Sequence, residues 1–239
     1  EFEMKFAEFA NCDHAIAVAN GTVALDLCWQ ALFKTENGLN KGDEVIVTSR
    51  TFLASVSSIV LAGLTPVFAD VDIASQNITT ESIEAVLTEK TRAILCVHLG
   101  GWPCDMPAIM SLAKQHDIFV IEDCAQAHGA KVNGRSVGSF GDMAAWSFCQ
   151  DKIMTTAGEG GMVTTNNKSL WNYAWSFKDH GKAYDTVYNQ PHPPGFRWLH
   201  ESFGTNWRMT EMQAAVGLEQ LKMMPEWHKK RSENAKRIL

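Results

Sequence analysis

The sequence predicts an α/β protein whose central sheet is mostly parallel and is flanked by helices. Short apolar runs bounded by turn residues alternate with longer stretches whose apolar residues recur at helical spacing. Strands that alternate with helices in this way build parallel sheets covered on both faces. Several polar candidates directly follow apolar strands, which is where ligands bind in sheets of this kind.

Length, charge and cysteine usage exclude several classes of protein. The 239 residues suffice for one large domain or two small ones with a substantial core. The formal net charge of −6 argues against broad nucleic-acid binding, and no apolar run approaches the roughly 20 residues that span a bilayer. The six cysteines form no CxxC pair, so we expect reduced thiols and a cytoplasmic protein.

The first half of the chain alternates helices and strands. Phe2, Phe6 and Phe9 indicate an amphipathic helix over residues 1–10. An apolar strand over 14–20 leads through a polar turn into a helix. The next expected elements are a strand over 43–48, a helix from Phe52 onward, a strand over 65–70 and a helix over 81–87.

The second half completes the sheet and then changes character. The expected elements are a strand over 91–98, helix 106–116, strand 118–123, a strand ending at Ser147, a strand after the glycine-rich turn AGEGG, and helix 168–178. Residues 179–205 are polar and lack periodicity, which indicates a functional or interfacial loop. The helix after Gly204 is apolar nearly all round, which predicts burial, and Pro225 is expected to break it before a basic, solvated helix.

Three polar residues at strand ends supply the groups needed to hold pyridoxal phosphate (PLP). A buried aspartate, here Asp123, keeps the pyridine nitrogen protonated so that the ring can withdraw electrons. Lys152 offers the primary amine that forms a Schiff base with the aldehyde. Ser147 offers a hydroxyl to the phosphate, which backbone N–H groups also bind.

Two further segments add candidates at the same edge of the sheet. The helix that begins at Gly21 and Thr22 follows a strand directly, so its N–H groups point at a ligand above the sheet. Thr22 could give its hydroxyl to a phosphate or serve only as a helix cap. Phe52 is suited to stacking on a pyridine ring, although a single phenylalanine is more often part of the core.

Other reactive side chains are interpreted as structural. Cys124 and Cys149 flank the proposed site, but no basic partner is evident that would activate a nucleophile. His98 and His128 are expected to be hydrogen-bonded rather than to act as acid or base. No HxxxH or cysteine-rich spacing accompanies them, so no metal site is predicted.

Four segments are more specific than the spacing alone: EDCAQAHGA, GSFGD, SFxxxK and EGGMVTT, in that order. They resemble the DegT/DnrJ/EryC1/StrS family of PLP-dependent nucleotide-sugar aminotransferases, and the resemblance extends from about Phe6 to Leu221. It implies a PLP-binding large domain of the aspartate-aminotransferase type (fold type I) over 1–221. Residues 222–239 would then begin a small C-terminal domain whose remainder this sequence lacks.

The resemblance also implies roles for individual residues. Phe52 would cover the PLP ring, and Gln126 would hydrogen-bond its O3′. Asn206 would reach across the interface of a homodimer to the phosphate of the other subunit's cofactor. The dehydratase branch of the family has histidine at the position of Lys152, so the lysine points to transamination.

The implied reaction moves an amino group from L-glutamate to a keto sugar carried on a nucleoside diphosphate. Lys152 would hold the cofactor and then move a proton between Cα of the donor and C4′ of the cofactor. Because specificity in this family resides partly in the absent segment, we expect this chain to bind PLP but to turn over poorly.

Two other functions stay open from the sequence. A PLP-dependent elimination or desulfuration enzyme would use the same cofactor residues for a different reaction. A non-catalytic, PLP-binding regulator would have no need to retain Lys152, Asp123 and Ser147 together.

Overall fold

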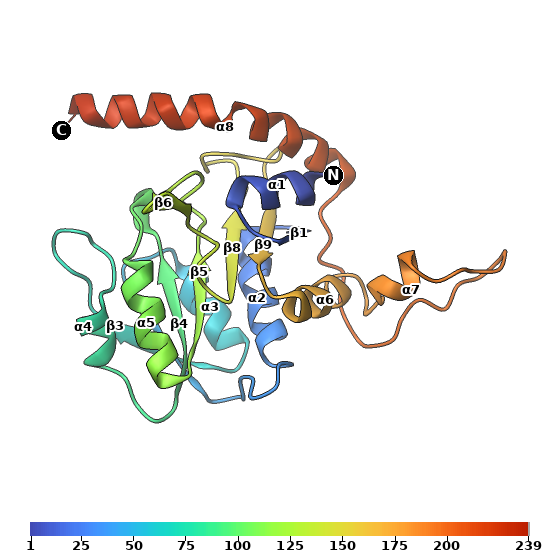
Figure 1. The fold of residues 1–239 in the computed structure, drawn as a ribbon, viewed down its shortest axis with the longest axis horizontal. Coiled ribbons are helices and arrows are strands. Elements are labelled where there is room, and N and C mark those ends of the chain that lie inside the picture. The colour runs from blue at the N-terminus through green and yellow to red at the C-terminus, as the bar shows by residue number, and fades with distance from the viewer. Residues whose placement is uncertain (239) are drawn as a thin grey trace.

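A seven-stranded sheet organises the chain in the computed structural model, which describes residues 1–238 (Figure 1). The strand order is β1-β9-β8-β5-β4-β2-β3. The pairs β3/β2, β2/β4, β4/β5 and β5/β8 are parallel, whereas β9 is antiparallel to both β8 and β1. The predicted mostly parallel sheet is therefore confirmed. Its strands are β1 (His14–Val18), β2 (Glu44–Thr48), β3 (Thr65–Ala69), β4 (Thr91–Val97), β5 (Phe119–Asp123), β8 (Met143–Ser147) and β9 (Gly161–Thr165).

Helices cover both faces of the sheet, as the strand alternation predicts (Figure 1). The helices α2, α3 and α6 pack on one face. The helices α1 and α8 cover one end of the other face, and α4 and α5 cover its opposite end. The helical segments are α1 (Phe2–Ala10), α2 (Gly21–Leu32), α3 (Leu53–Leu61), α4 (Thr80–Glu84), α5 (Met106–His116), α6 (Lys168–Phe177), α7 (Tyr184–Tyr188), α8 (Glu211–Ile238) and a 3₁₀ turn η1 (Leu99–Gly101).

Side-chain caps fix where several helices begin. The Asn20 side chain accepts a hydrogen bond from the N–H of Val23, so Asn20 rather than Thr22 caps α2. Thr79 and Ser82 form a reciprocal capping box at α4. Asp105 caps α5, where a proline fits the first turn because its N–H would be unpaired there.

The carboxyl ends of the parallel strands lie at one edge of the sheet. Asp123 ends β5 and Ser147 ends β8, and these two strands pair directly. β1 runs antiparallel to β9 and β9 antiparallel to β8, so the end of β1 reaches the same edge. Gly161 pairs with both Val18 and Ser147, which brings the start of α2 beside the end of β8.

The expectation that Pro225 breaks the last helix is wrong, because α8 is a single helix of 28 residues that contains Pro225 in its interior. Proline removes one backbone hydrogen bond, but packing holds the helix on both sides of that position. Leu221, Met224 and Trp227 contact the cluster around α1. The predicted domain boundary between residues 221 and 222 falls inside α8, so this helix would have to link the two domains as one element.

The expectation that this helix is buried is also wrong for residues 1–238. Only Gly217 and Met224 of α8 are buried, and Met212 is 79% exposed. The helix lies beside α1 and extends past the body of the protein (Figure 1). The apolar side chains of α8 therefore pack against the rest of the protein only along part of the helix.

The 179–205 segment contains more regular structure than its sequence predicts. It includes the short helix α7 and a backbone bridge between Lys182 and His200.

A hairpin of β6 (Lys131–Val132) and β7 (Arg135–Ser136) forms a separate small sheet. Among residues 1–238, no helix combines the length and the apolar character needed to cross a membrane.

Candidate active site

A cavity of about 640 Å³ opens at the carboxyl edge of the sheet. Seven of the eight predicted site residues line it, contributed by α2, α3, β5, β8 and the turns after these strands. Asn206 is the eighth and is not among the lining residues. The lining candidates are Gly21, Thr22, Phe52, Asp123, Gln126, Ser147 and Lys152.

The N-terminus of α2 forms one wall of the cavity in close contact with β8. A Cβ atom on Gly21 would lie 2.6 Å from Cβ of Ser147, so only glycine allows this approach without displacement. Within residues 1–238 the N–H groups of Gly21 and Thr22 have no hydrogen-bond acceptor. Two unpaired donors at the positive end of a helix form a site for an anion.

Asp123 is the buried acid of the cavity, with 7% of its surface exposed. One carboxylate oxygen accepts from the N–H of Ala125 at 3.1 Å, and the other accepts from the hydroxyl of Ser55 at 2.7 Å. Burial raises the pKa of Asp123 above its ordinary value, although both hydrogen bonds act in the opposite direction. A cation placed in the cavity would offset this cost of burial.

Lys152 reaches the cavity from the turn that follows β8. Its backbone N–H bonds the carbonyl of Cys149, which fixes the turn, and its side chain is 20% exposed. The ammonium lies 3.5 Å from the exposed carboxylate of Asp151. An exposed contact of that length restrains a lysine only weakly, so the amine is available to a ligand in the cavity.

Phe52 and Gln126 contribute an aromatic face and an amide. Phe52 precedes the first turn of α3 and is 71% exposed at the cavity, so it is not a core residue. The side-chain oxygen of Gln126 accepts from the N–H of Gly100 at 2.6 Å. This contact leaves the amide NH₂ of Gln126 free to donate to a ligand.

Ser55 and Thr51 complete the surroundings of Asp123 and were not predicted from the sequence. Their hydroxyl oxygens are 2.7 Å apart, and both residues line the cavity. Serine at this point of an apolar helix resembles a surface residue, so composition gives no signal. The inward-facing position of Ser55 becomes evident only when the first turn of α3 is placed at the end of β5.

Asn206 lies outside the cavity in the single chain. Its backbone bridges Asp179, and Asp179 forms ion pairs with Lys182 and Arg208. The side chain of Asn206 is exposed and makes no hydrogen bond with residues 1–238. Its predicted role toward a second subunit stays a prediction.

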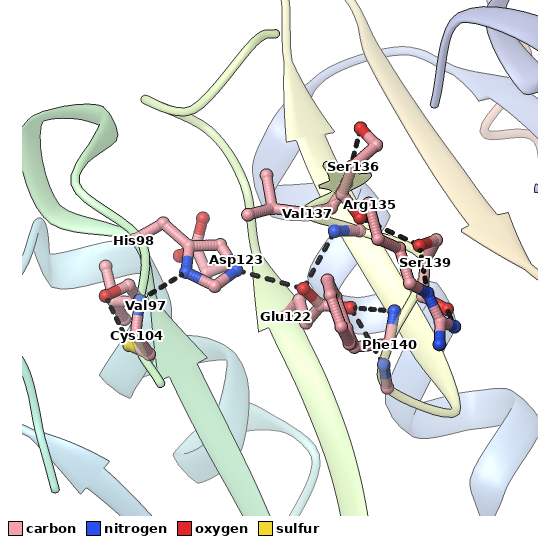
Figure 2. A network of polar contacts seen from close by, with 12 residues as sticks. Val97, His98, Cys104, Glu122, Asp123, Arg135, Ser136, Val137, Ser139 and Phe140 are labelled. Carbon is pink, nitrogen blue, oxygen red and sulfur yellow. Dashed lines mark hydrogen bonds and ion pairs between the residues drawn. The ribbon is translucent and has the colours of Figure 1, made fainter. Parts of the chain in front are cut away.

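His98 and Glu122 form a buried hydrogen-bonded pair next to the cavity, and Figure 2 shows the polar network around them. Their side chains are fully buried, with His98 Nε2 3.0 Å from Glu122 Oε2. The N–H of Cys104 donates to His98 Nδ1 at 3.1 Å. His98 therefore donates from Nε2, and the interpretation of His98 as a hydrogen-bonded structural residue agrees with this geometry.

Glu122 also accepts three backbone N–H groups, from Gly138, Phe140 and Gly141, each at 2.8 Å. Burial alone would raise the pKa of Glu122, but these hydrogen bonds and His98 hold it below its ordinary value. His98, Glu122 and Cys124 lie close enough to bridge a metal ion. The carboxylate and both ring nitrogens are already engaged with the protein, so hydrogen bonding accounts for the cluster.

Replacing Glu122 with glutamine is expected to destabilise the protein by about 3–5 kcal/mol, because an amide NH₂ would then face buried donors. Urea denaturation followed by tryptophan fluorescence measures this change. Because the folded pKa is lowered, the contribution is complete above pH 4.5 and is lost as the pH falls below that value. The difference between wild type and E122Q should therefore shrink in acid, and a constant difference would contradict this account. The exposed Glu84→Gln variant is the control.

Cys124, Cys149 and His128 offer no competing nucleophile or base in the cavity. Burial raises the pKa of Cys124 and of Cys149, so neither thiol ionises readily. His128 is buried against Trp146 and Phe148, and burial followed by the charge of Lys152 lowers its pKa to about 3. Its ring nitrogens have no partner within the described residues, so the expectation that His128 is hydrogen-bonded is wrong.

Comparisons with known proteins identify the family of the chain. Residues 1–239 match the DegT/DnrJ/EryC1/StrS aminotransferase family. The chain is 45% identical over 235 residues to GDP-perosamine synthase of Escherichia coli O157:H7, which covers 98% of this chain and 60% of that protein. It is 42% identical over 214 residues to the UDP-N-acetyl-3-dehydro-alpha-D-glucosamine 3-aminotransferase of Acidithiobacillus ferrooxidans, covering 90% and 53%.

A solved structure is closer still. The X-ray structure of the aminotransferase from Psychrobacter cryohalolentis shares 65% sequence identity and a TM-score of 0.95, covering 98% of this chain and 58% of that one. The fold is that of the PLP-dependent aminotransferases of fold type I. The chain belongs to the DegT/DnrJ/EryC1/StrS aminotransferase family. It spans about 60% of the length of the relatives it matches.

Proposed function

We propose that the protein is a PLP-dependent aminotransferase that transfers an amino group from L-glutamate to a keto group of a nucleoside-diphosphate sugar. The observation that carries this proposal is that Asp123, Lys152 and the N-terminus of α2 line one cavity. An acid, a primary amine and an anion site on separate walls match the ring nitrogen, the aldehyde and the phosphate of PLP.

The residues present fit this cofactor. Asp123 is a buried carboxylate with a raised pKa, so it gains from a protonated ring nitrogen beside it. The free N–H groups of Gly21 and Thr22, with Ser147 alongside, are suited to the phosphate. The exposed face of Phe52 would stack on the ring, and the free NH₂ of Gln126 would donate to O3′.

The chain's own residues would divide the work of the reaction. PLP, when bound, supplies an electron-withdrawing ring that stabilises negative charge at Cα of an amino acid. Asp123 would keep the proton on the ring nitrogen. Lys152 would hold the aldehyde carbon and, once released, carry a proton to and from the donor's Cα.

The names of the relatives support an amino sugar product. One carries GDP and another UDP, and both are named for the synthesis or amination of a sugar. Because the nucleotide differs between them, we propose only the class of substrate, a keto sugar on a nucleoside diphosphate. All six cysteines are free thiols, which supports a cytoplasmic location.

A glutamate half-reaction tests the proposed activity. Glutamate should convert the bound cofactor to its amine form and release one equivalent of 2-oxoglutarate, measured by absorbance and by coupled assay. An elimination or desulfuration enzyme would instead release ammonia or sulfide from other amino acids. A non-catalytic regulator would bind PLP and leave glutamate unchanged, and either result would contradict the proposal.

We further propose a homodimer in which each subunit completes the other's site. The helix α3 supports this because it turns Ser55 and Ser58 inward while Val60 and Leu61 face solvent, Leu61 being 77% exposed. An apolar helix face that continues from Phe52 at the cavity rim is suited to a second copy. Asn206, exposed and outside its own cavity, would then serve the partner's cofactor phosphate.

Subunit complementation tests this arrangement. The variants K152A and N206A should each be inactive, because each lacks one part of every site. After exchange of their subunits, each mixed dimer would hold one intact site, so a 1:1 mixture should recover about a quarter of wild-type activity. Absence of recovery, with subunit exchange shown by mass spectrometry, would overturn the shared site.

A further inference from the structure

The strongest unassigned feature of the cavity is a line of hydroxyl groups that ends on Asp123. Ser55 is 1% exposed, and its hydroxyl donates to Asp123 Oδ2 at 2.7 Å. Thr51 Oγ1 lies 2.7 Å from the same serine oxygen. Both distances are ordinary for hydrogen bonds between oxygens, and both contacts lie at the start of α3.

The direction of these hydrogen bonds follows from the number of protons. A serine hydroxyl has a single proton, and Ser55 gives it to the carboxylate. Thr51 must therefore donate to Ser55, so the line runs from Thr51 through Ser55 to Asp123. Donors aligned in this way polarise one another and strengthen the last bond, which reaches the charged group.

The hydrogen bond from Ser55 also fixes the orientation of the Asp123 carboxylate. Oδ1 is held by the N–H of Ala125 and Oδ2 by the hydroxyl of Ser55, so both oxygens are fixed and the carboxylate cannot rotate freely. Each oxygen can still accept one more hydrogen bond. The charged and titratable groups that face Asp123 are Lys152 after β8, His98 at the end of β4, Cys28 on α2 and Cys124.

We propose that Ser55 is a positioning residue, supported by Thr51, that keeps Asp123 ionised and oriented toward the ring nitrogen of PLP. This inference rests on the proposed function, because it assigns Asp123 to that nitrogen. Without the serine hydroxyl, the burial that raises the pKa of Asp123 is less opposed, so the carboxylate is less available as a counter-ion.

The chain provides a matched control in the same helix. Ser58 is also fully buried in α3, but its hydroxyl accepts from Trp29 Nε1 at 3.1 Å and donates to the backbone carbonyl of Ser55 at 3.2 Å, and it makes no hydrogen bond with Asp123. Ser58→Ala removes the same atom from the same kind of environment. Ser55→Cys keeps nearly the shape of the side chain but replaces a strong donor with a weak one.

The test measures PLP affinity by absorbance titration and the pH midpoint of the visible band of bound PLP. S55A should weaken PLP binding about 10-fold to 100-fold, because a hydrogen bond to a charged group is lost, and should displace the pH midpoint. S55C should fall between S55A and wild type, and S58A should match wild type in both measurements.

A double-mutant cycle separates this role from a general effect on folding. Since Ser55 acts through Asp123, S55A should weaken PLP binding little further when added to D123N. Wild-type behaviour of both S55A and S55C, or full additivity with D123N, would overturn the role of Ser55 while leaving the proposed function intact. Failure of the wild-type protein to bind PLP would overturn both.

Discussion

Replacing Lys152 with alanine will remove the covalent attachment of PLP and reduce transamination by about 10²–10⁴-fold or more. The reason is that Lys152 is the primary amine among the cavity's lining residues, reaching it from the turn after β8. The measurement is borohydride reduction of the PLP-loaded protein, followed by peptide mapping. Wild type should carry the label on Lys152, and K152A should carry none.

Lys131 and Lys178 provide the controls for this experiment. Lys131 is exposed on β6, away from the cavity lining, and Lys178 forms an ion pair with Glu3. K131A should retain both the label and the activity. A label on Lys131 or Lys178 in the wild-type protein would contradict the site assignment, whatever the activity of K152A.

Replacing Asp123 with asparagine is expected to weaken PLP binding by about 10²–10⁴-fold, because a buried charge pair worth about 3–5 kcal/mol is broken. Asparagine keeps the size of the side chain, its oxygen can still accept from the N–H of Ala125, and its NH₂ can donate to the hydroxyl oxygen of Ser55. The loss therefore reports on the charge rather than on packing. Absorbance titration with PLP at several pH values measures the change.

The adjacent acid, Glu122, distinguishes a cofactor effect from a stability effect. Asp123 and Glu122 are neighbours on β5, so their side chains point to opposite faces of the sheet. D123N should change PLP affinity with little loss of stability in the cofactor-free protein, whereas E122Q should do the reverse. Equal effects of the two variants on PLP affinity would remove Asp123 from its proposed role.

Much of this fold and site can be predicted from the sequence because strand ends carry local signals. Apolar runs that stop at Asp123 and Ser147 fix both the strands and the edge where they end. Once the sheet is parallel, its topology brings these residues to one cavity with Lys152. The grouping of the candidate residues thus follows from the apolar periodicity and from the order of strands and helices along the chain, and a single sequence contains both.

The features that could not be predicted depend on packing between distant segments. Ser55 faces Asp123 only because the first turn of α3 reaches the end of β5, and nothing in SVSS marks which serine turns inward. Pro225 does not end α8, because contacts of Met224 with the α1 cluster hold the helix together. The apolar pattern of α8 predicts a buried face, but a pattern cannot say which surface covers it.

The contact between Gly21 and Ser147 limits how this protein can vary. Gly21 packs directly on Ser147, and Gly161 packs on the backbone of Asn20, where a Cβ atom would collide with the carbonyl oxygen. A mutational scan should find these two glycines intolerant even of alanine, while their polar neighbours accept some exchange. Substitutions that change substrate preference would then have to occur on the side of the cavity away from the N-terminus of α2. The proposed phosphate site would stay unchanged among variants.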